Sequence, residues 1–109
     1  MDEVLKNLDI LFETPQLLGR ATPDEWYRLL CEYGYSVKPL GRGNLEKVHF
    51  INGGGFRVLW GGDRIFQYHP TASLGRKHHH GDDAYYKIGS GTHGLRWYNL
   101  DGTPQVRSG

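Results

Sequence analysis

The sequence changes character at Gly34, and this change most limits what the chain can fold into. Before it, apolar residues recur at the spacing of amphipathic helices, whereas after it glycine-punctuated runs alternate like β-strands. Helices followed by a run of strands are typical of an α+β protein. We therefore predict N-terminal helices, in residues 1–34, packed on an antiparallel β-sheet meander, in residues 35–109.

The length of the chain favours one domain. Its 109 residues suffice for a single modest core, so we expect one domain over residues 1–109. With one cysteine, Cys31, neither an internal disulfide nor a cysteine-rich zinc site can form. No apolar run is long enough to cross a bilayer and no leader begins at Met1, which favours a soluble chain without a membrane partner.

Two helices are expected in the first part. Thr22 is positioned to cap a helix that begins at Pro23, and Glu25 completes a capping box. The apolar stripe of this helix consists of Trp26, Leu29, Leu30 and Tyr33. Gly34 then supplies a stop. An upstream helix that ends before Pro15 is predicted by the same spacing in Val4, Leu8, Leu11 and Phe12.

The stretch FRVLWGGDRIFQYH, residues 56–69, predicts a β-hairpin whose register follows from side-chain parity. A three-residue loop at 61–63 pairs Val58 with Phe66 and gathers the aromatic side chains on one face. On this register the helices cover the face that carries Phe56, Val58, Trp60 and Phe66. The opposite face, where a ligand can bind, carries Arg57, Leu59, Ile65, Gln67 and His69.

Two further strands complete the predicted sheet. They are expected at residues 84–88 and 93–100, with a turn at residues 89–91 between them and a final turn at residues 101–102. The connection at residues 70–83 holds turn residues and the sequence HHHGDD, which predicts a course over the surface.

Charge is unevenly distributed along the chain, although the net charge is only +1. Residues 1–35 hold seven acidic and three basic residues, a net charge of −4, while residues 36–109 hold five acidic and ten basic residues, a net charge of +5. All six histidines lie in the second part. A basic, histidine-rich part beside an acidic one suits an anionic ligand on one face, and an unevenly charged solvated surface is the alternative.

Three consecutive histidines in the connection make a metal site one interpretation. His78 and His80 point to the same side of an extended segment, and Asp82, Asp83 or His93 can complete the ligand set. The stretch lacks the HExxH spacing, the cysteines and the repeated His-x-His pair of zinc motifs. Acid–base chemistry without a metal or another cofactor is therefore the preferred interpretation.

Metal-independent RNA cleavage needs side chains that this part of the chain supplies. A base removes the 2′-hydroxyl proton, an acid protonates the leaving 5′-oxygen, and cations or amides stabilise the phosphorane. Histidine can take both proton-transfer roles near neutral pH. Such groups cluster within residues 69–96. They are the histidines His69, His79, His80 and His93, the cations Lys87 and Arg96, and the hydroxyls Ser90 and Thr92.

Each of these residues also has an ordinary structural interpretation. Lys87 and Arg96 suit solvated strand positions, while Ser90 and Thr92 suit a turn. Five aromatic residues are similarly ambiguous, because one or two can stack on unpaired bases while most fill the core. They are Tyr68, Tyr85, Tyr86, Trp97 and Tyr98.

Several segments of the second half occur in a fixed order: GGGFRVLWGGD (53–63), FQYHP (66–70), the paired histidines, YYKIGSG (85–91) and LRWYNLDG (95–102). Through these segments and their order, the second half of the chain resembles the C-terminal toxin domains of bacterial polymorphic toxins of the Rhs and contact-dependent type. These domains are similar to the small RNase folds of barnase, EndoU and the colicin-like toxins. The resemblance implies a metal-independent endoribonuclease whose N-terminal helices pack on an antiparallel sheet that bears the site.

The resemblance also implies roles for individual residues. The paired histidines fall on His79 and His80, which act as base or acid. Lys87 and Arg96 stabilise the phosphorane, and Ser90 corresponds to the turn serine. Independently of the resemblance, the side-chain inventory makes Arg57, His69, Thr92 and His93 the candidates for substrate binding. The implied partners are RNA and a cognate immunity protein, and the implied destination is the cytoplasm of a target cell.

A noncatalytic binding module is the second hypothesis. In that case the face that carries Arg57, Gln67 and His69 holds an anionic or protein partner without changing it. Incubation with RNA in the presence of EDTA separates the two hypotheses, because a metal-independent nuclease produces fragments and a binding module leaves the RNA intact.

Overall fold

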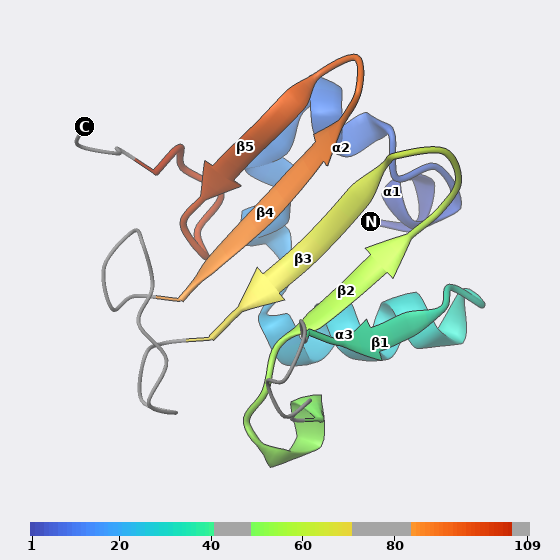
Figure 1. Ribbon diagram of the computed structural model, residues 1–109, viewed down its shortest axis with the longest axis vertical. Helices are drawn as coiled ribbons and strands as arrows, with labels where there is room; N and C mark the ends of the chain where they lie inside the picture. Colours follow the sequence, from blue (N-terminus) through green and yellow to red (C-terminus); the bar gives the residue numbers. More distant parts are fainter. Residues whose placement is uncertain (41–48, 71–83, 106–109) are drawn as a thin grey trace.

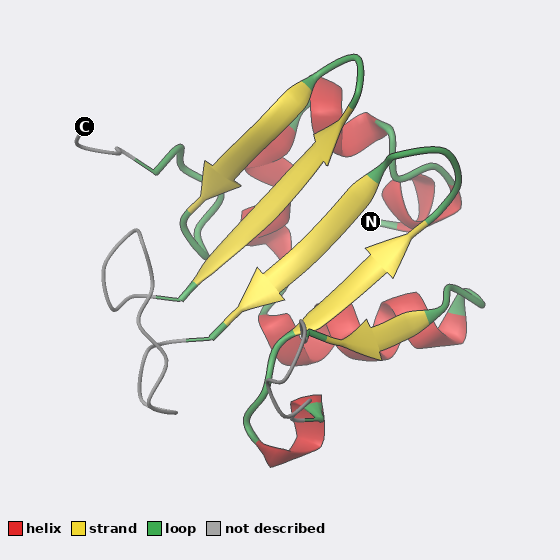
Figure 2. Cartoon of the chain, in the orientation of Figure 1, coloured by secondary structure: helices red, strands yellow, loops and turns green. Residues whose placement is uncertain are grey.

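The structure is a computed structural model that describes residues 1–40, 49–70 and 84–105, and it has two layers. Figure 1 and Figure 2 show the α-helices grouped behind one face of a sheet, whose other face is turned toward the viewer. The sheet has five strands that lie side by side in the order in which they occur in the chain, and each is antiparallel to its neighbours. The prediction of an α+β fold, with N-terminal helices on an antiparallel meander, is confirmed.

The helical layer is more broken than the apolar spacing predicts. The expected upstream helix is divided into α1 (Asp2–Lys6) and α2 (Ile10–Glu13), and a 3₁₀ helix, η1 (Pro15–Arg20), follows. The division lies at Asn7, which has non-helical backbone angles and whose side-chain oxygen accepts a backbone N–H two residues later. The apolar residues that predict the helix are nevertheless all buried. No helix in the described ranges is long and apolar enough to span a bilayer.

The helix α3 (Pro23–Glu32) begins and is capped as predicted, but Tyr33 of the predicted apolar stripe follows its last residue and is exposed. The Thr22 hydroxyl accepts the Glu25 N–H at 3.2 Å, and the Glu25 carboxylate accepts the Thr22 N–H at 3.0 Å, which completes the capping box. The bond from the Thr22 N–H is the main cause that lowers the pKa of the Glu25 carboxyl. Gly34 follows the helix with a φ of 87°, a left-handed conformation that favours glycine.

Replacing Thr22 with alanine is expected to lower the free energy of unfolding by about 1 kcal/mol, because the Glu25 N–H loses its acceptor. Thr22→Ser keeps the hydroxyl and is the control. Urea unfolding followed by circular dichroism measures both variants. The hydrogen bond from the Thr22 N–H lowers the pKa of the Glu25 carboxyl, so the charged carboxylate stabilises the folded protein. This stabilisation is fully present above the ordinary glutamate pKa and is lost as the pH falls through the lowered pKa. Equal stability of Thr22→Ala and wild type would contradict this account.

The sheet begins with β1 (Val37–Pro39), a strand that the sequence pattern does not predict. It pairs with β2 (Phe56–Leu59), and Lys38 lies opposite Arg57. Three residues that end in proline are too short to display an alternating pattern. A second 3₁₀ helix, η2 (Phe50–Asn52), precedes the other strands. These strands are β2 (Phe56–Leu59), β3 (Ile65–His69), β4 (Tyr85–Ser90) and β5 (Gly94–Tyr98).

The β2–β3 hairpin has the predicted register. Val58 lies opposite Phe66, so the three-residue loop at 61–63 is confirmed. The loop uses positive φ angles of 117° at Gly61 and 57° at Gly62. Glycine adopts such angles without steric cost, which is why the chain reverses here.

The β4–β5 turn lies two residues later than predicted. Gly89 and Ser90 belong to β4, the turn occupies residues 91–93, and β5 is correspondingly shorter than expected. The Ser90 hydroxyl accepts the His93 N–H at 3.0 Å, which closes the turn after the strand. Gly94 completes the reversal with a φ of 71°.

One hydrophobic core joins the two layers. Trp26 of α3 is fully buried, its ring edge meets Phe66 with centroids 5.2 Å apart, and its Nε1–H donates to the Leu18 carbonyl at 2.9 Å. Burial raises the pKa of the Tyr86 hydroxyl, which therefore stays protonated and faces the Ala21 carbonyl. The core side chains of the strands are Phe56, Val58, Phe66, Tyr86, Ile88 and Tyr98.

A polar contact fixes the helical layer to the β2–β3 loop. Arg64 Nη1 lies 2.9 and 3.0 Å from the two carboxylate oxygens of Asp9. Trp60 Nε1–H donates to Asp9 Oδ1 at 2.8 Å, and the Trp60 ring stacks on Phe12. Trp60 therefore faces the helices, as predicted, and Arg64 is held by a structural ion pair.

Candidate functional site

The face of the sheet turned away from the helices is the candidate site. Side chains alternate along each strand, so the neighbours of the core residues project onto this second face. We call it the open face, because no described helix covers it (Figure 1). Its residues are Lys38, Arg57, Leu59, Ile65, Gln67, His69, Tyr85, Lys87, Gly89, Leu95 and Trp97.

One row of the open face crosses all five strands. The register places Lys38 opposite Arg57, Arg57 opposite Gln67, Gln67 opposite Lys87, and Lys87 opposite Trp97. We call these five residues the basic row. At a strand spacing of about 4.8 Å, the row is about 19 Å long. Lys87 Nζ lies 5.8 Å from the centroid of the Trp97 ring, in a cation–π contact.

The charges of the two layers have opposite signs. The basic row contains two lysines and one arginine, and no described strand position on the open face is acidic. The acidic residues of the helical part are Asp2, Glu3, Asp9, Glu13, Asp24, Glu25 and Glu32. An anion is therefore attracted to the open face rather than to the helical side.

His69 has a defined orientation at the end of β3. Its ring stacks on Tyr85 with centroids 4.7 Å apart and an angle of 7° between the planes. His69 Nε2 lies 2.7 Å from the side-chain oxygen of Gln67. With this oxygen as the acceptor, Nε2 carries a proton in this contact. Histidine is a side chain that can transfer protons near neutral pH.

Lys87 and Arg96 do not share a face, contrary to their expected joint role. Arg96 lies opposite Ile88, whose side chain is buried against the helices, so Arg96 projects on the helix side of β5. Lys87 projects on the open face. The two cations therefore do not flank a phosphate from the same side of the sheet. The cations that share the open face with Lys87 are Arg57 and Lys38, and Gln67 lies between Lys87 and Arg57.

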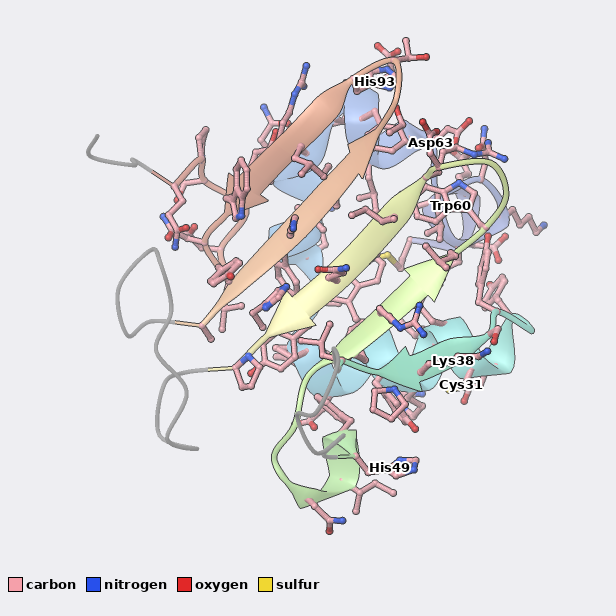
Figure 3. All side chains as sticks on the ribbon, in the orientation of Figure 1. Cys31, Lys38, His49, Trp60, Asp63 and His93 are labelled. Carbon is pink, nitrogen blue, oxygen red and sulfur yellow. The ribbon has the colours of Figure 1, made fainter. Side chains whose placement is uncertain are left out.

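The predicted residues Ser90, Thr92 and His93 gather at the β4–β5 turn. Figure 3 shows His93 at this end of the sheet, far along the strands from the end where β3 reaches His69. The His93 ring stacks on Phe12 with centroids 4.4 Å apart, and Nδ1 lies 2.9 Å from Ser90 Oγ. Thr92 is exposed in the turn. Ser90 and His93 thus close the turn and attach it to the helices, and neither lies on the open face.

His79 and His80, the expected acid and base, lie outside the described residues. The whole HHHGDD stretch that supplies the alternative metal ligands lies outside them as well. Within the described ranges, no group of three histidine, cysteine or acidic side chains is arranged to hold a metal ion. Of the histidines in those ranges, His69 is the one on the open face.

Lys38 and Trp97 complete the basic row and are not among the predicted site residues. Lys38 lies on β1, which the sequence pattern does not predict, and Figure 3 shows it at the edge of the sheet opposite β5. Trp97 belongs to the aromatic residues that the sequence leaves ambiguous. Its pairing with Lys87 assigns it to the open face, and this pairing depends on the position of the β4–β5 turn.

No family model, no curated protein and no solved structure matches this chain. Neither family membership nor a fold relative therefore limits the choice of function. The choice rests on the geometry of the open face and on the sequence features that point to RNA.

Proposed function

We propose that the protein binds RNA on the open face of its sheet. The supporting observation is the basic row, in which Lys38, Arg57 and Lys87 share one face with an amide and an indole side chain. Cations that neutralise phosphates release counterions, which supplies most of the affinity in nonspecific binding. Aromatic and amide groups among the cations contact bases, a combination typical of RNA-binding surfaces.

Replacing Lys38 and Arg57 together with glutamine is expected to weaken RNA binding about 25-fold at about 0.1 M salt. The reason is that each lost phosphate contact removes a slope of about 0.7 from the dependence of log K on log salt. The three cations predict a slope of about −2 for the wild type and about −0.7 for the double variant. Fluorescence anisotropy of a labelled 2′-O-methyl RNA measures both, because this RNA lacks the hydroxyl needed for self-attack.

The matched control replaces Lys6 and Arg28 with glutamine, which removes the same charge from the helical layer. Their side chains are 69% and 60% exposed and form surface pairs with Asp2 and Glu32, so folding changes little. We expect this control to bind RNA almost as the wild type does. Equal loss in both double variants would reveal a dependence on net charge alone, and wild-type protein that binds no RNA would overturn the proposal.

Cleavage of RNA without a metal is the second function, and the position of His69 favours it. His69 lies opposite Tyr85, two residues along β4 from Lys87. A phosphate bound to Lys87 and Arg57 therefore has a histidine nearby on the same face. In the proposed reaction the 2′-oxygen attacks phosphorus, and the bond from phosphorus to the 5′-oxygen breaks.

Two proton transfers accompany this reaction. One histidine takes the 2′-hydroxyl proton and a second gives a proton to the 5′-oxygen, which leaves a 2′,3′-cyclic phosphate. His69 is one candidate, and His79 and His80 are the candidates from the sequence. Lys87 and Arg57 stabilise the charge of the phosphorane. If no cleavage occurs, the open face acts as a noncatalytic binding surface.

A further inference from the structure

We infer that the open face selects single-stranded RNA, whose unpaired bases cover an apolar row beside the basic row. This inference rests on the proposed function and names the form of its ligand. Leu59 lies opposite Ile65, Ile65 opposite Gly89, and Gly89 opposite Leu95. We call Leu59, Ile65 and Leu95 the apolar row.

The apolar row is continuous, and its two ends are exposed while Ile65 is half-buried. Leu59 on β2 and Leu95 on the edge strand β5 are each 50% exposed. Gly89 has no side chain, but the Leu95 side chain extends over it, because a Cβ added at Gly89 would lie only 2.6 Å from Leu95 Cδ2. The row therefore has no gap at Gly89. Single exposed apolar residues are common, but a row of them along a set of cations is typical of a binding surface.

The distance between the two rows suits a nucleotide chain. Residues two positions apart on a strand are separated by about 6.7 Å, so the apolar row runs parallel to the basic row at about that distance. A sugar–phosphate backbone on the basic row can extend its bases sideways onto the apolar row. At β5 the exposed Leu95 neighbours Trp97 on the same face, which adds an aromatic surface for a base.

Duplex RNA cannot use both rows. Its bases are paired inside the helix, so it offers phosphates to the basic row and nothing apolar to Leu59 or Leu95. A row of about 19 Å matches the lower end of single-strand site sizes, about four nucleotides. Because Lys38, Arg57 and Lys87 flank the apolar row, its occupant is expected to be anionic, which favours RNA over an apolar protein segment.

The test compares three probes: a labelled 2′-O-methyl RNA of about eight nucleotides, the duplex of the same sequence, and inorganic polyphosphate. We expect wild-type protein to bind the single strand about tenfold more tightly than the duplex. The double variant Leu59→Ser/Leu95→Ser should weaken single-strand binding about tenfold, because it removes the surface that the bases cover. Its binding of polyphosphate should stay within about twofold of wild type.

Ile51→Ser is the matched control, because Ile51 is 82% exposed and lies on η2 rather than on the open face. It should change the binding of none of the probes. Duplex binding equal to single-strand binding would overturn the inference, even where the Lys38 and Arg57 variants still weaken binding. If the Leu59→Ser/Leu95→Ser variant lost polyphosphate binding in parallel with RNA binding, this result would also overturn the inference. Absence of RNA binding by wild type would remove the proposed function itself.

Discussion

Replacing Trp26 with alanine is expected to lower the free energy of unfolding by about 3–5 kcal/mol. The indole lies between α3 and the sheet with no exposed surface, and it contacts Phe66 edge-on. Truncation leaves a cavity that the two layers cannot close. It also removes the Nε1–H that satisfies the buried Leu18 carbonyl. The whole stability of a domain this size is about 5–15 kcal/mol, so the loss is a large part of it.

Urea unfolding followed by circular dichroism measures this loss. Trp26→Phe keeps an aromatic ring but not the donor, so it should lose less, about 1–3 kcal/mol, and it remains measurable if Trp26→Ala does not fold. Ile51→Ala is the control for apolar truncation at an exposed position and should change stability by less than about 0.5 kcal/mol. A loss below about 1 kcal/mol for Trp26→Ala would contradict a core centred on this residue.

The parts of the fold that local chemistry determines were predictable from the sequence. The capping box at Thr22 and Glu25 depends on residues three apart, and it forms as predicted. The β2–β3 register depends on one glycine loop, which parity identifies. The upstream helix was not predictable in the same way, since Asn7 interrupts it without disturbing the apolar spacing. Helical spacing alone does not reveal a local side-chain hydrogen bond that ends a helix.

The candidate site was predictable only in part, because its residues are far apart in the sequence. Arg57 and His69 were assigned to one face by the hairpin parity, and the register agrees. The expected joint role of Lys87 and Arg96 conflicts with the same rule. In a hairpin with a three-residue turn, odd-numbered residues pair with odd-numbered residues and even-numbered with even-numbered ones. Lys87 and Arg96 therefore project on opposite faces of the sheet. Lys38 required knowledge of β1, which only the folded sheet supplies.

Replacing His79 and His80 together with alanine is expected to reduce RNA cleavage at least about 100-fold, because removing a general acid or base costs about 10²–10⁴-fold in rate. The assay incubates RNA with each protein in the presence of EDTA and detects fragments that end in a 2′,3′-cyclic phosphate. Binding of 2′-O-methyl RNA should be nearly unchanged in this variant, since the proposed binding surface is the basic row. His69→Asn tests the third candidate in the same assay and should reduce cleavage while the protein remains folded.

His93→Ala is the matched control, because it also removes an imidazole. That ring stacks on Phe12 and bonds to Ser90 at the β4–β5 turn, away from the open face, so its loss should reduce stability and leave cleavage largely intact. Full activity of the His79/His80 variant would remove this pair from the mechanism. If wild-type protein binds RNA tightly and leaves it intact, the protein is a noncatalytic binding module. If EDTA abolishes cleavage, metal-dependent chemistry is favoured over proton transfer by histidine alone.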